Sequence, residues 1–278
     1  MIRETAPAKV NLVLQVGDVR EDGLHELCSL FASVDLADEV TVEQHDGVGD
    51  EVICAGVSGP NLATRAAEEL RAGLDGGLVP LRVTIDKRIP VAAGLGGGSA
   101  DAAAVLRAGN AIAGNALDAA ALRTIGARIG ADVPSQIEPR HALVTGAGEN
   151  VEPLELPPMA LVLIPQDEGL STADVYRTAD QIGSTRQTLD PAPLRALAAR
   201  PLTELAAALE NDLEPAALHL RRDLEQHLQA LTRAGAIAAR VTGSGPTTFG
   251  VFPDREQAEQ AAAGLSSKSV VTTLRSQA

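Results

Sequence analysis

Aromatic residues are nearly absent from this chain, whose 278 residues include three Phe, one Tyr and no Trp. The hydrophobic core therefore has to be built from Ala, Val, Leu and Ile, and each aromatic side chain is easier to weigh as a ligand contact. Hydrophobic residues still make up 45% of the chain, which is an ordinary share for a globular protein. A chain of this length suits one large domain or two smaller domains that share an interface.

Cysteine is equally scarce, since Cys28 and Cys54 are the only two. Their spacing matches neither a zinc site nor a disulfide framework. The longest apolar run, at 159–164, is far too short to cross a bilayer. No apolar signal segment is visible near the N-terminus. We therefore expect a reduced, cytoplasmic protein.

Positive charge is also in deficit, because the net charge is −14 at pH 7. Such an acidic chain repels nucleic acids and anionic membranes, so we expect neither as a partner. Binding of a small anionic nucleotide remains compatible with this net charge, because it depends on local positive groups. Candidates are Lys9, Lys87, Arg88 and a helix N-terminus. We expect a small-molecule substrate and a monomer or weak homodimer.

The most informative segment is the glycine-rich run Pro-Val-Ala-Ala-Gly-Leu-Gly-Gly-Gly-Ser-Ala-Asp at 90–101. It joins a strand-like segment at 81–85 to an alanine-rich helical segment at 100–113. Glycines let a backbone wrap closely around a ligand, and a helix that begins beside Ser99 directs free N–H groups and its positive dipole end into the loop. This context favours a phosphate-binding loop over a flexible glycine linker.

Three familiar phosphate-binding loops do not match this run. A Walker A loop ends in Gly-Lys-Ser/Thr, and no lysine follows these glycines. The dinucleotide fingerprint would have Ser99 in place of its last glycine, and Asp118, near the position of its acidic partner, resembles a helix cap. The protein-kinase glycine loop comes with V-A-I-K and H-R-D elements, which are absent here.

Two other clusters contain residues suited to phosphoryl transfer. In Pro-Ala-Lys-Val-Asn-Leu, Lys9 and Asn11 share one side of a strand because strand side chains alternate. In Gly-Ala-Asp-Val-Pro, the proline restrains Asp132, and a fixed carboxylate can orient a substrate hydroxyl and accept its proton. Taken singly, Lys9 is equally well explained as a surface lysine on an edge strand, and Asp132 is better explained as a turn residue bonded to its own backbone.

These motifs, followed by a second glycine turn at 242–247, occur in an order that resembles the GHMP superfamily of small-molecule kinases. Within it, further motifs favour the branch that acts on 4-diphosphocytidyl-2-C-methyl-D-erythritol in the non-mevalonate synthesis of isoprenoid precursors. They are Arg-Glu-Asp-Gly-Leu-His-Glu-Leu at 20–27, Pro-Asn-Leu at 60–62, Asp-Lys-Arg-Ile-Pro at 86–90, Gly-Ala-Gly-Glu at 146–149 and Asn-Asp-Leu-Glu at 211–214. The resemblance covers nearly the whole chain and implies transfer of phosphate from ATP, with Mg²⁺, to the 2-hydroxyl of that substrate.

The resemblance also implies roles for individual residues. Asp132 would be the catalytic base, and Lys9 would keep its carboxylate charged and neutralise charge on the transferring phosphoryl group. The ATP-binding residues would be Pro90, Val91, Ala92, Ala93, Gly94, Leu95, Gly96, Gly97, Gly98, Ser99 and Ala100, with Asn61 and Lys87 near the adenosine and Ser99 also a Mg²⁺ contact. The substrate-binding residues would be Asn11, Leu24, His25, Thr172 and Tyr176, with His25 facing the cytosine and Tyr176 stacking on it.

Some positions depart from the branch. Leu24 stands where an aromatic residue would cover one face of the cytosine, and base–aromatic stacking is worth about 1–3 kcal/mol. After Pro134 the chain reads Ser-Gln-Ile-Glu-Pro-Arg-His instead of Phe and a glycine-rich turn, and Ala100-Asp101 replaces the usual Ser-Asn or Ser-Ala. These differences leave two alternatives open, a kinase for another small alcohol and a binding protein that has lost turnover.

The expected fold is α+β, because strands and helices are mixed without a regular βαβα alternation. The resemblance implies a ribosomal protein S5 domain 2-like ATP-binding domain at 1–155 and a ferredoxin-like domain at 156–278, with the site between them. The boundary falls in a stretch rich in Pro and Glu at 153–158. We also expect two long amphipathic helices, at 191–209 and 215–234.

Overall fold

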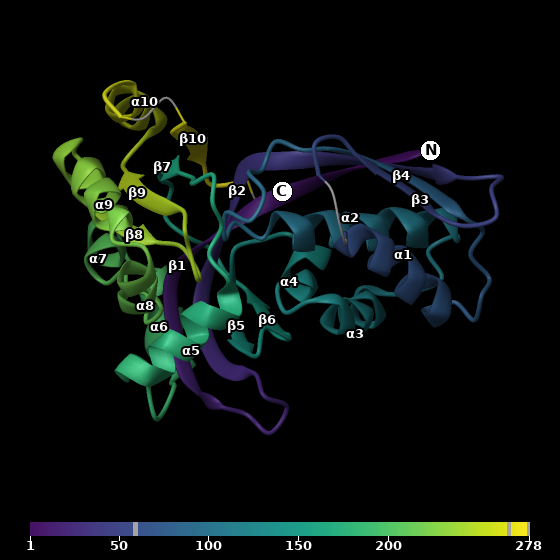
Figure 1. Cartoon of the computed structure of the whole chain (residues 1–278), viewed down its shortest axis with the longest axis horizontal. Coiled ribbons are helices and arrows are strands. Elements are labelled where there is room, and N and C mark those ends of the chain that lie inside the picture. Colours follow the sequence, from purple (N-terminus) through teal and green to yellow (C-terminus); the bar gives the residue numbers. More distant parts are fainter. Residues whose placement is uncertain (58–60, 266–267, 277–278) are drawn as a thin grey trace.

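The structure is a computed structural model, and it describes residues 1–57, 61–265 and 268–276. Pro60, which opens the Pro-Asn-Leu motif, lies outside the described residues. Two β-sheets organise the molecule (Figure 1). The first sheet and its helices form the right-hand part of Figure 1, and the second sheet with its helices forms the left-hand part.

The first sheet is built on two very long antiparallel strands, β1 and β2. The other edge of β2 pairs with β5 through its first half and with β4 through its second half. β3 joins β4 in parallel, and β6 joins β5 antiparallel. The strands are β1 (Ile2–Val19), β2 (His25–Gln44), β3 (Glu51–Cys54), β4 (Leu81–Asp86), β5 (Ala142–Gly146) and β6 (Asn150–Pro153).

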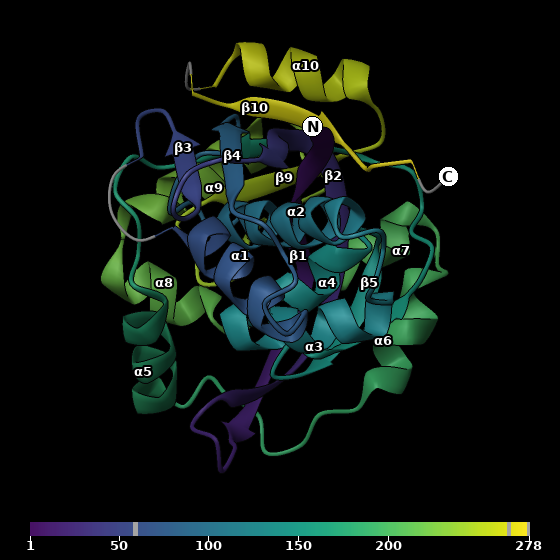
Figure 2. The ribbon, with the colours of Figure 1, turned by 90° about the vertical axis from the view of Figure 1, so that its right-hand side faces the viewer.

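Four helices cover one face of this sheet (Figure 2). They are α1 (Leu62–Gly73), α2 (Gly97–Ile112), α3 (Ala119–Ile129) and α4 (Val133–Ile137). Most residues of α2 are buried, and many of these are alanines, which lets this helix pack closely against both α1 and β1. The side chains of Asn61 and Asp118 cap the first turns of α1 and α3, so the expected cap at Asp118 is present.

The second sheet has the order β10-β7-β9-β8 and is antiparallel throughout. In β7, Leu161 and Leu163 pack toward β1 and β2, while Val162 and Ile164 pack toward α9 and α10. The strand is therefore buried on both faces. The face that bears Leu161 and Leu163 belongs to the core that joins the two sheets. These elements are β7 (Ala160–Ile164), β8 (Ala238–Val241), β9 (Thr248–Phe252), β10 (Val270–Thr273), α5 (Thr172–Ile182), α6 (Pro191–Ala198), α7 (Leu202–Ala207), α8 (Glu214–Leu220), α9 (Asp223–Arg233) and α10 (Arg255–Ala263).

The mixed α+β composition agrees with the sequence prediction, but both long helices were predicted wrongly. The first divides into α6 and α7 at Pro201, whose ring removes a helical N–H donor and disfavours helix at Arg200. The second divides into α8 and α9 at Arg221, which leaves helical geometry while its guanidinium binds the Asp223 carboxylate. None of the helices in the described ranges is long and apolar enough to cross a membrane.

Candidate active site

The glycine-rich loop ends in the N-terminus of α2, which begins at Gly97, slightly earlier than expected. The N–H of Ala100 donates to the carbonyl of Gly96 and forms the first helical bond. The N–H groups of Gly97, Gly98 and Ser99 have no acceptor among the residues that the structure describes. Three free donors at the positive end of a helix form an anion-binding site.

Two glycines of this loop are required by its close approach to other segments. Gly94 has a φ of +75°, and a Cβ there would lie 2.5 Å from the carbonyl oxygen of Gly245. Gly96 has a φ of +71°, and a Cβ there would lie 3.0 Å from Cγ of Lys9. Any side chain at either position would push the loop away from these neighbours. The loop thus lies directly on the stem of Lys9.

Lys9 is a buried cation, with 7% of its side chain exposed, and is not a surface lysine. Its Nζ donates to Oδ1 of Asn11 at 2.7 Å and lies 3.2 Å from Oδ2 of Asp132. The same Nζ lies over the ring of Phe31, 4.7 Å from the centroid, in a favourable cation–π position. The sequence analysis missed Phe31, although antiparallel pairing of β1 and β2 places it directly opposite Asn11.

Asp132 lies between α3 and α4, and 31% of its side chain is exposed. Its carboxylate does not cap α4. The interpretation of Asp132 as a turn residue bonded to its own backbone is therefore wrong. Its carboxylate instead contacts the ammonium of Lys9, a residue that is distant in the sequence. Pro134, in the first turn of α4, restricts the backbone next to it. A partly exposed carboxylate beside a buried ammonium can accept a proton from a bound hydroxyl.

Two cavities meet at the glycine-rich loop. The first, named the nucleotide cavity after the sequence prediction for its lining residues, has a volume of about 430 Å³ and is lined by Asn61, Lys87 and the loop from 90 to 99. The acceptor cavity has a volume of about 770 Å³ and is lined by Lys9, Asn11 and Asp132, among others. Both cavities share the side of the loop at Gly94, Gly96 and Ser99, together with Thr172. A phosphate held on this loop would lie between them.

The nucleotide cavity contains every predicted ATP-binding residue except Ala100, which is buried behind the loop. Lys87 is held by two carboxylates that the sequence analysis did not assign to it, Asp38 at 2.5 Å and Asp101 at 2.8 Å. Burial opposes its charge, but these carboxylates raise the pKa of Lys87 above its usual value. Burial raises the pKa of Asp101 to about 7. A lysine side chain that is only 13% exposed needs such partners.

The acceptor cavity contains all five predicted substrate-binding residues, Asn11, Leu24, His25, Thr172 and Tyr176. Leu24 is half exposed at the cavity. Tyr176 lies against His25, with ring centroids 4.9 Å apart and the planes tilted by 38°. Burial and the nearby Asp132 charge raise the pKa of the Tyr176 phenol. The structure also places Asp180 here, one helical turn after Tyr176, and the sequence analysis missed it.

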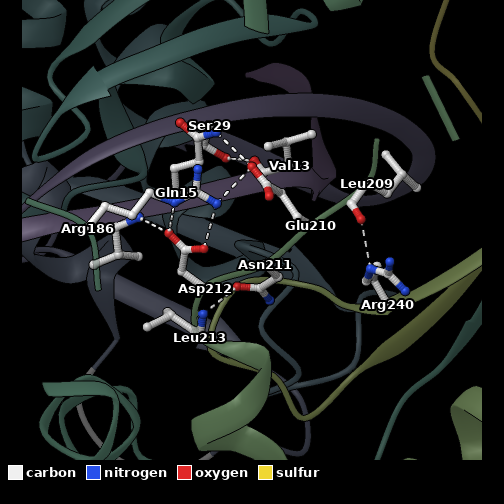
Figure 3. Close-up of polar contacts among 11 residues, drawn as sticks. Val13, Gln15, Ser29, Arg186, Leu209, Glu210, Asn211, Asp212, Leu213 and Arg240 are labelled. Carbon is white, nitrogen blue, oxygen red and sulfur yellow. Dashed lines mark hydrogen bonds and ion pairs between the residues drawn. The ribbon is translucent and has the colours of Figure 1, made fainter. Parts of the chain in front are cut away.

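The Asn-Asp-Leu-Glu motif at 211–214 had no structural role assigned from the sequence. In the structure it attaches β1 to the second sheet (Figure 3). The N–H of Asp212 donates to the carbonyl of Leu14. The Asp212 carboxylate accepts from the N–H of Val16 at 2.9 Å and from both ends of the Arg186 guanidinium at 2.7 and 2.9 Å. We call Asn211 and Asp212 the clasp. A bidentate arginine makes this attachment geometrically specific.

Asn211 extends the clasp to the second glycine turn, at 242–247. Its Nδ2 donates to the carbonyls of Val241 and Gly243, both at 2.8 Å. Gly243 opens the second glycine turn, and a Cβ there would lie 3.2 Å from Oδ1 of Asn11. In the same turn, Oγ1 of Thr242 accepts from the N–H of Asn11. The clasp therefore fixes the turn that lies against Asn11, the neighbour of Lys9.

Models of two families match this chain. The model of the GHMP kinases N terminal domain matches residues 61–138, and the GHMP kinases C terminal model matches residues 194–270. A 4-diphosphocytidyl-2-C-methyl-D-erythritol kinase of Anaeromyxobacter dehalogenans is 44% identical over 271 residues, which cover 94% of this chain and 83% of the relative. The enzyme of the same name from Mycolicibacterium smegmatis is 41% identical over 281 residues, which cover 97% of this chain and 87% of that relative.

Solved structures are similar as well. A crystal structure of 4-(cytidine 5'-diphospho)-2C-methyl-D-erythritol kinase has a TM-score of 0.82 and 35% identity, and the match covers 99% of this chain and all of that one. Homoserine kinase from Cytophaga hutchinsonii has a TM-score of 0.75 at 20% identity, and the match covers 99% of this chain and 94% of that chain. At that identity the likeness to homoserine kinase concerns the fold alone.

We predict that Asn211→Ala lowers both the stability and the phosphoryl-transfer rate. The substitution leaves two buried carbonyls without a donor, which costs about 1–3 kcal/mol, and releases the turn beside Asn11. The matched control is Asn110→Ala, because Asn110 is also buried and joins two atoms of Leu117 at the far end of α2. Urea unfolding should show a loss in both variants, whereas turnover of the folded protein should fall only in Asn211→Ala. Equal turnover in the two variants would contradict a role of the clasp in the active site.

Proposed function

The chain belongs to the GHMP kinase family, and from this premise we propose that it phosphorylates the 2-hydroxyl of 4-diphosphocytidyl-2-C-methyl-D-erythritol with ATP, in the synthesis of isoprenoid precursors. The family models and the relatives above confirm the predictions of a small-molecule kinase and of the two-domain fold. The observation that carries the proposal is the Lys9–Asp132 pair, 3.2 Å apart, in a cavity that shares the glycine-rich loop with a second cavity.

We propose that Asp132 accepts the proton of the substrate hydroxyl as its oxygen attacks the γ-phosphorus of ATP. The bond from that phosphorus to the β-phosphate oxygen breaks, and ADP leaves. Lys9 lies beside Asp132 and can neutralise the negative charge that builds up around the transferring group. Because Asn11 and Phe31 already surround its Nζ, Lys9 is oriented before the substrates bind.

The loop offers suitable groups for the phosphates of ATP, because the N–H groups of Gly97, Gly98 and Ser99 are free. Asn61 and Lys87 line the same cavity and are the proposed neighbours of the adenosine. Mg²⁺ prefers oxygen ligands and keeps several waters and phosphate oxygens. The Ser99 hydroxyl lines both cavities and is the group that we propose for contact with the ion.

Recognition of the acceptor is proposed for the other end of the acceptor cavity. Asn11 and Thr172 lie near the loop, where the erythritol part would bind, and His25 and Tyr176 lie together where the base would bind. Leu24 favours the second candidate, a kinase for another small alcohol, because this half-exposed side chain cannot stack on a base as an aromatic ring does. A binding protein without turnover is disfavoured by the intact Lys9–Asp132 pair.

The division into domains at 1–155 and 156–278 remains our proposal, as does a monomer or weak homodimer without nucleic acid or membrane partners. The strands of the first sheet end at Pro153 and those of the second begin at Ala160, which supports a boundary in this interval. The two sheets share one apolar core, so the parts are expected to unfold together.

The decisive experiment measures ADP release from Mg-ATP by the purified protein with 4-diphosphocytidyl-2-C-methyl-D-erythritol, homoserine and mevalonate in parallel. Turnover of the cytidyl substrate alone is the expected result. Turnover of another alcohol instead would keep the kinase chemistry and overturn the proposed substrate.

We predict that Asp132→Asn lowers kcat by about 10²–10⁴-fold, because a general base contributes an acceleration of this size. Nucleotide affinity, measured by calorimetry, should change little, since Asp132 is not among the residues that line the nucleotide cavity. Asp118→Asn is the matched control, because asparagine also caps helices well and Asp118 lies outside both cavities. Unchanged kcat in Asp132→Asn would remove the proposed base.

We predict that Leu24→Tyr lowers KM for the cytidyl substrate severalfold and leaves kcat within about twofold. The new ring would supply part of a stacking energy of about 1–3 kcal/mol. Ile182→Tyr adds the same ring to another exposed aliphatic position outside the acceptor cavity and should leave KM as it is. If KM stays the same in both variants, the base does not lie against residue 24.

A further inference from the structure

We propose that His141 is a pH-sensitive latch, which holds the C-terminal segment 272–275 against the first sheet at neutral pH and releases it in acid. The inference goes beyond the proposed function and does not depend on the identity of the substrate. It assigns a role to the last residue of the run Ser-Gln-Ile-Glu-Pro-Arg-His at 135–141, which the transfer reaction does not use.

The strap, as we call residues 272–275, connects the two sheets. Through β10 it pairs with β7 of the second sheet. It then lies along the edge of β2 that β5 covers at 27–31 and β4 covers at 39–44 (Figure 1). Between those two stretches the described strands of the first sheet leave this edge of β2 unpaired, so the strap fills the gap.

Backbone contacts attach the strap to β2 within this gap. Leu274 forms an antiparallel bridge with Val34. The N–H of Arg275 donates to the carbonyl of Ser33 at 2.9 Å. The strap is therefore attached near the middle of β2, beside the start of β5.

His141 contacts both β2 and the strap at this point. The residue is only 3% exposed. Its Nδ1 accepts a hydrogen bond from the N–H of Ser33 at 3.1 Å, and the backbone of Arg275 is an acceptor for the ring. A neutral imidazole that accepts at Nδ1 carries its proton on Nε2. The neutral ring therefore accepts from β2 and donates to the strap.

A second proton on the ring would break this arrangement. Protonation converts Nδ1 into a donor that faces the N–H of Ser33, so both groups lose their hydrogen-bond partner. It also places a positive charge in a buried site. Burial accordingly lowers the pKa of His141, and the negative charge of Glu155 opposes this effect only in part.

Other charged residues of the adjoining segments are exposed or engaged elsewhere. The Asp35 carboxylate of β2 accepts from the Thr273 hydroxyl. Arg140 is exposed, and Arg275 faces the ring through its backbone. Among the described residues, the charge that favours a protonated ring is therefore that of Glu155.

The direction of the pH effect follows from this environment. In the unfolded chain a histidine takes up a proton near pH 6.5, whereas in the folded chain His141 takes it up at a lower pH. The stabilisation is therefore complete above about pH 6.5 and declines as the pH falls below this value. Ser33 is also the partner of Lys9 in the pairing of β1 with β2, so release of the strap would disturb the strand next to Lys9.

The first test measures urea unfolding at pH 7.5 and 5.5 in the wild type and in His141→Asn. Asparagine keeps an acceptor oxygen for the N–H of Ser33 but cannot take up a proton. The unfolding constant of the wild type, relative to that of the variant, should rise severalfold on acidification, with a limit of about tenfold for a single histidine. His219→Asn removes an exposed imidazole from α8 and should keep the wild-type pH dependence. A constant ratio between the wild type and His141→Asn overturns the proposal.

The second test observes the ring of the wild-type protein in ¹H–¹⁵N spectra of the histidine side chains, where the contact with the amide proton of Ser33 identifies His141. We expect a proton on Nε2 at pH 7.5 and a midpoint of titration below pH 6.5. A proton on Nδ1 at pH 7.5, or a ring that titrates at pH 6.5 or above, contradicts the latch.

Amide hydrogen exchange of the strap, corrected for the intrinsic effect of pH, completes this test. Exchange in the wild type should be up to about tenfold faster at pH 5.5 than at pH 7.5, because an opened strap leaves His141 free to take up a proton. The change should be smaller in His141→Asn. The same pH dependence in both proteins would assign the effect to other groups and refute the proposal.

Discussion

Burial of a single ammonium group, that of Lys9, determines how the rest of the site is arranged. A charge that loses its water is costly unless other groups replace that water. Here the replacements are the Asp132 carboxylate, the amide oxygen of Asn11 and the ring of Phe31. They come from a helix connection and from both long strands, so the charge can be balanced only when these segments are assembled. The glycine-rich loop lies on the lysine stem, which is why residue 96 has no side chain.

The register of strand β1 links the position of Lys9 to the packing of the two sheets. The side chains of this strand alternate, so Lys9 and Asn11 lie in the acceptor cavity while Ala8, Val10 and Leu12 lie in the core that joins the two sheets. A shift of one residue would exchange these two faces. The clasp opposes such a shift, because Asp212 binds the backbone of β1 at Val16. The position of Lys9 beside Asp132 and the packing of the two sheets therefore depend on the same register.

Local features of this fold could be predicted from the sequence, and features set by tertiary contacts could not. The loop before α2, the cap at Asp118 and the α+β class follow from short patterns of glycine, polar and apolar residues. The partners of Lys9 and Lys87 lie far apart in the chain, so spacing gives no sign of Asp38 beside Lys87. Periodicity also continued through Pro201, where the proline itself was the available signal for a helix end.

Exposure differs between the two ends of the acceptor cavity. Lys9, with 7% of its side chain exposed, is enclosed by the core, whereas Leu24 and Asp180 lie at the open end, 50% and 43% exposed. The buried ammonium of Lys9 tolerates little change around it, because removing a partner leaves an uncompensated charge. At the open end water replaces a lost contact, so side chains there can differ at little cost to the fold. A substitution at Lys9 or Asp132 therefore costs the fold more than a substitution at Leu24.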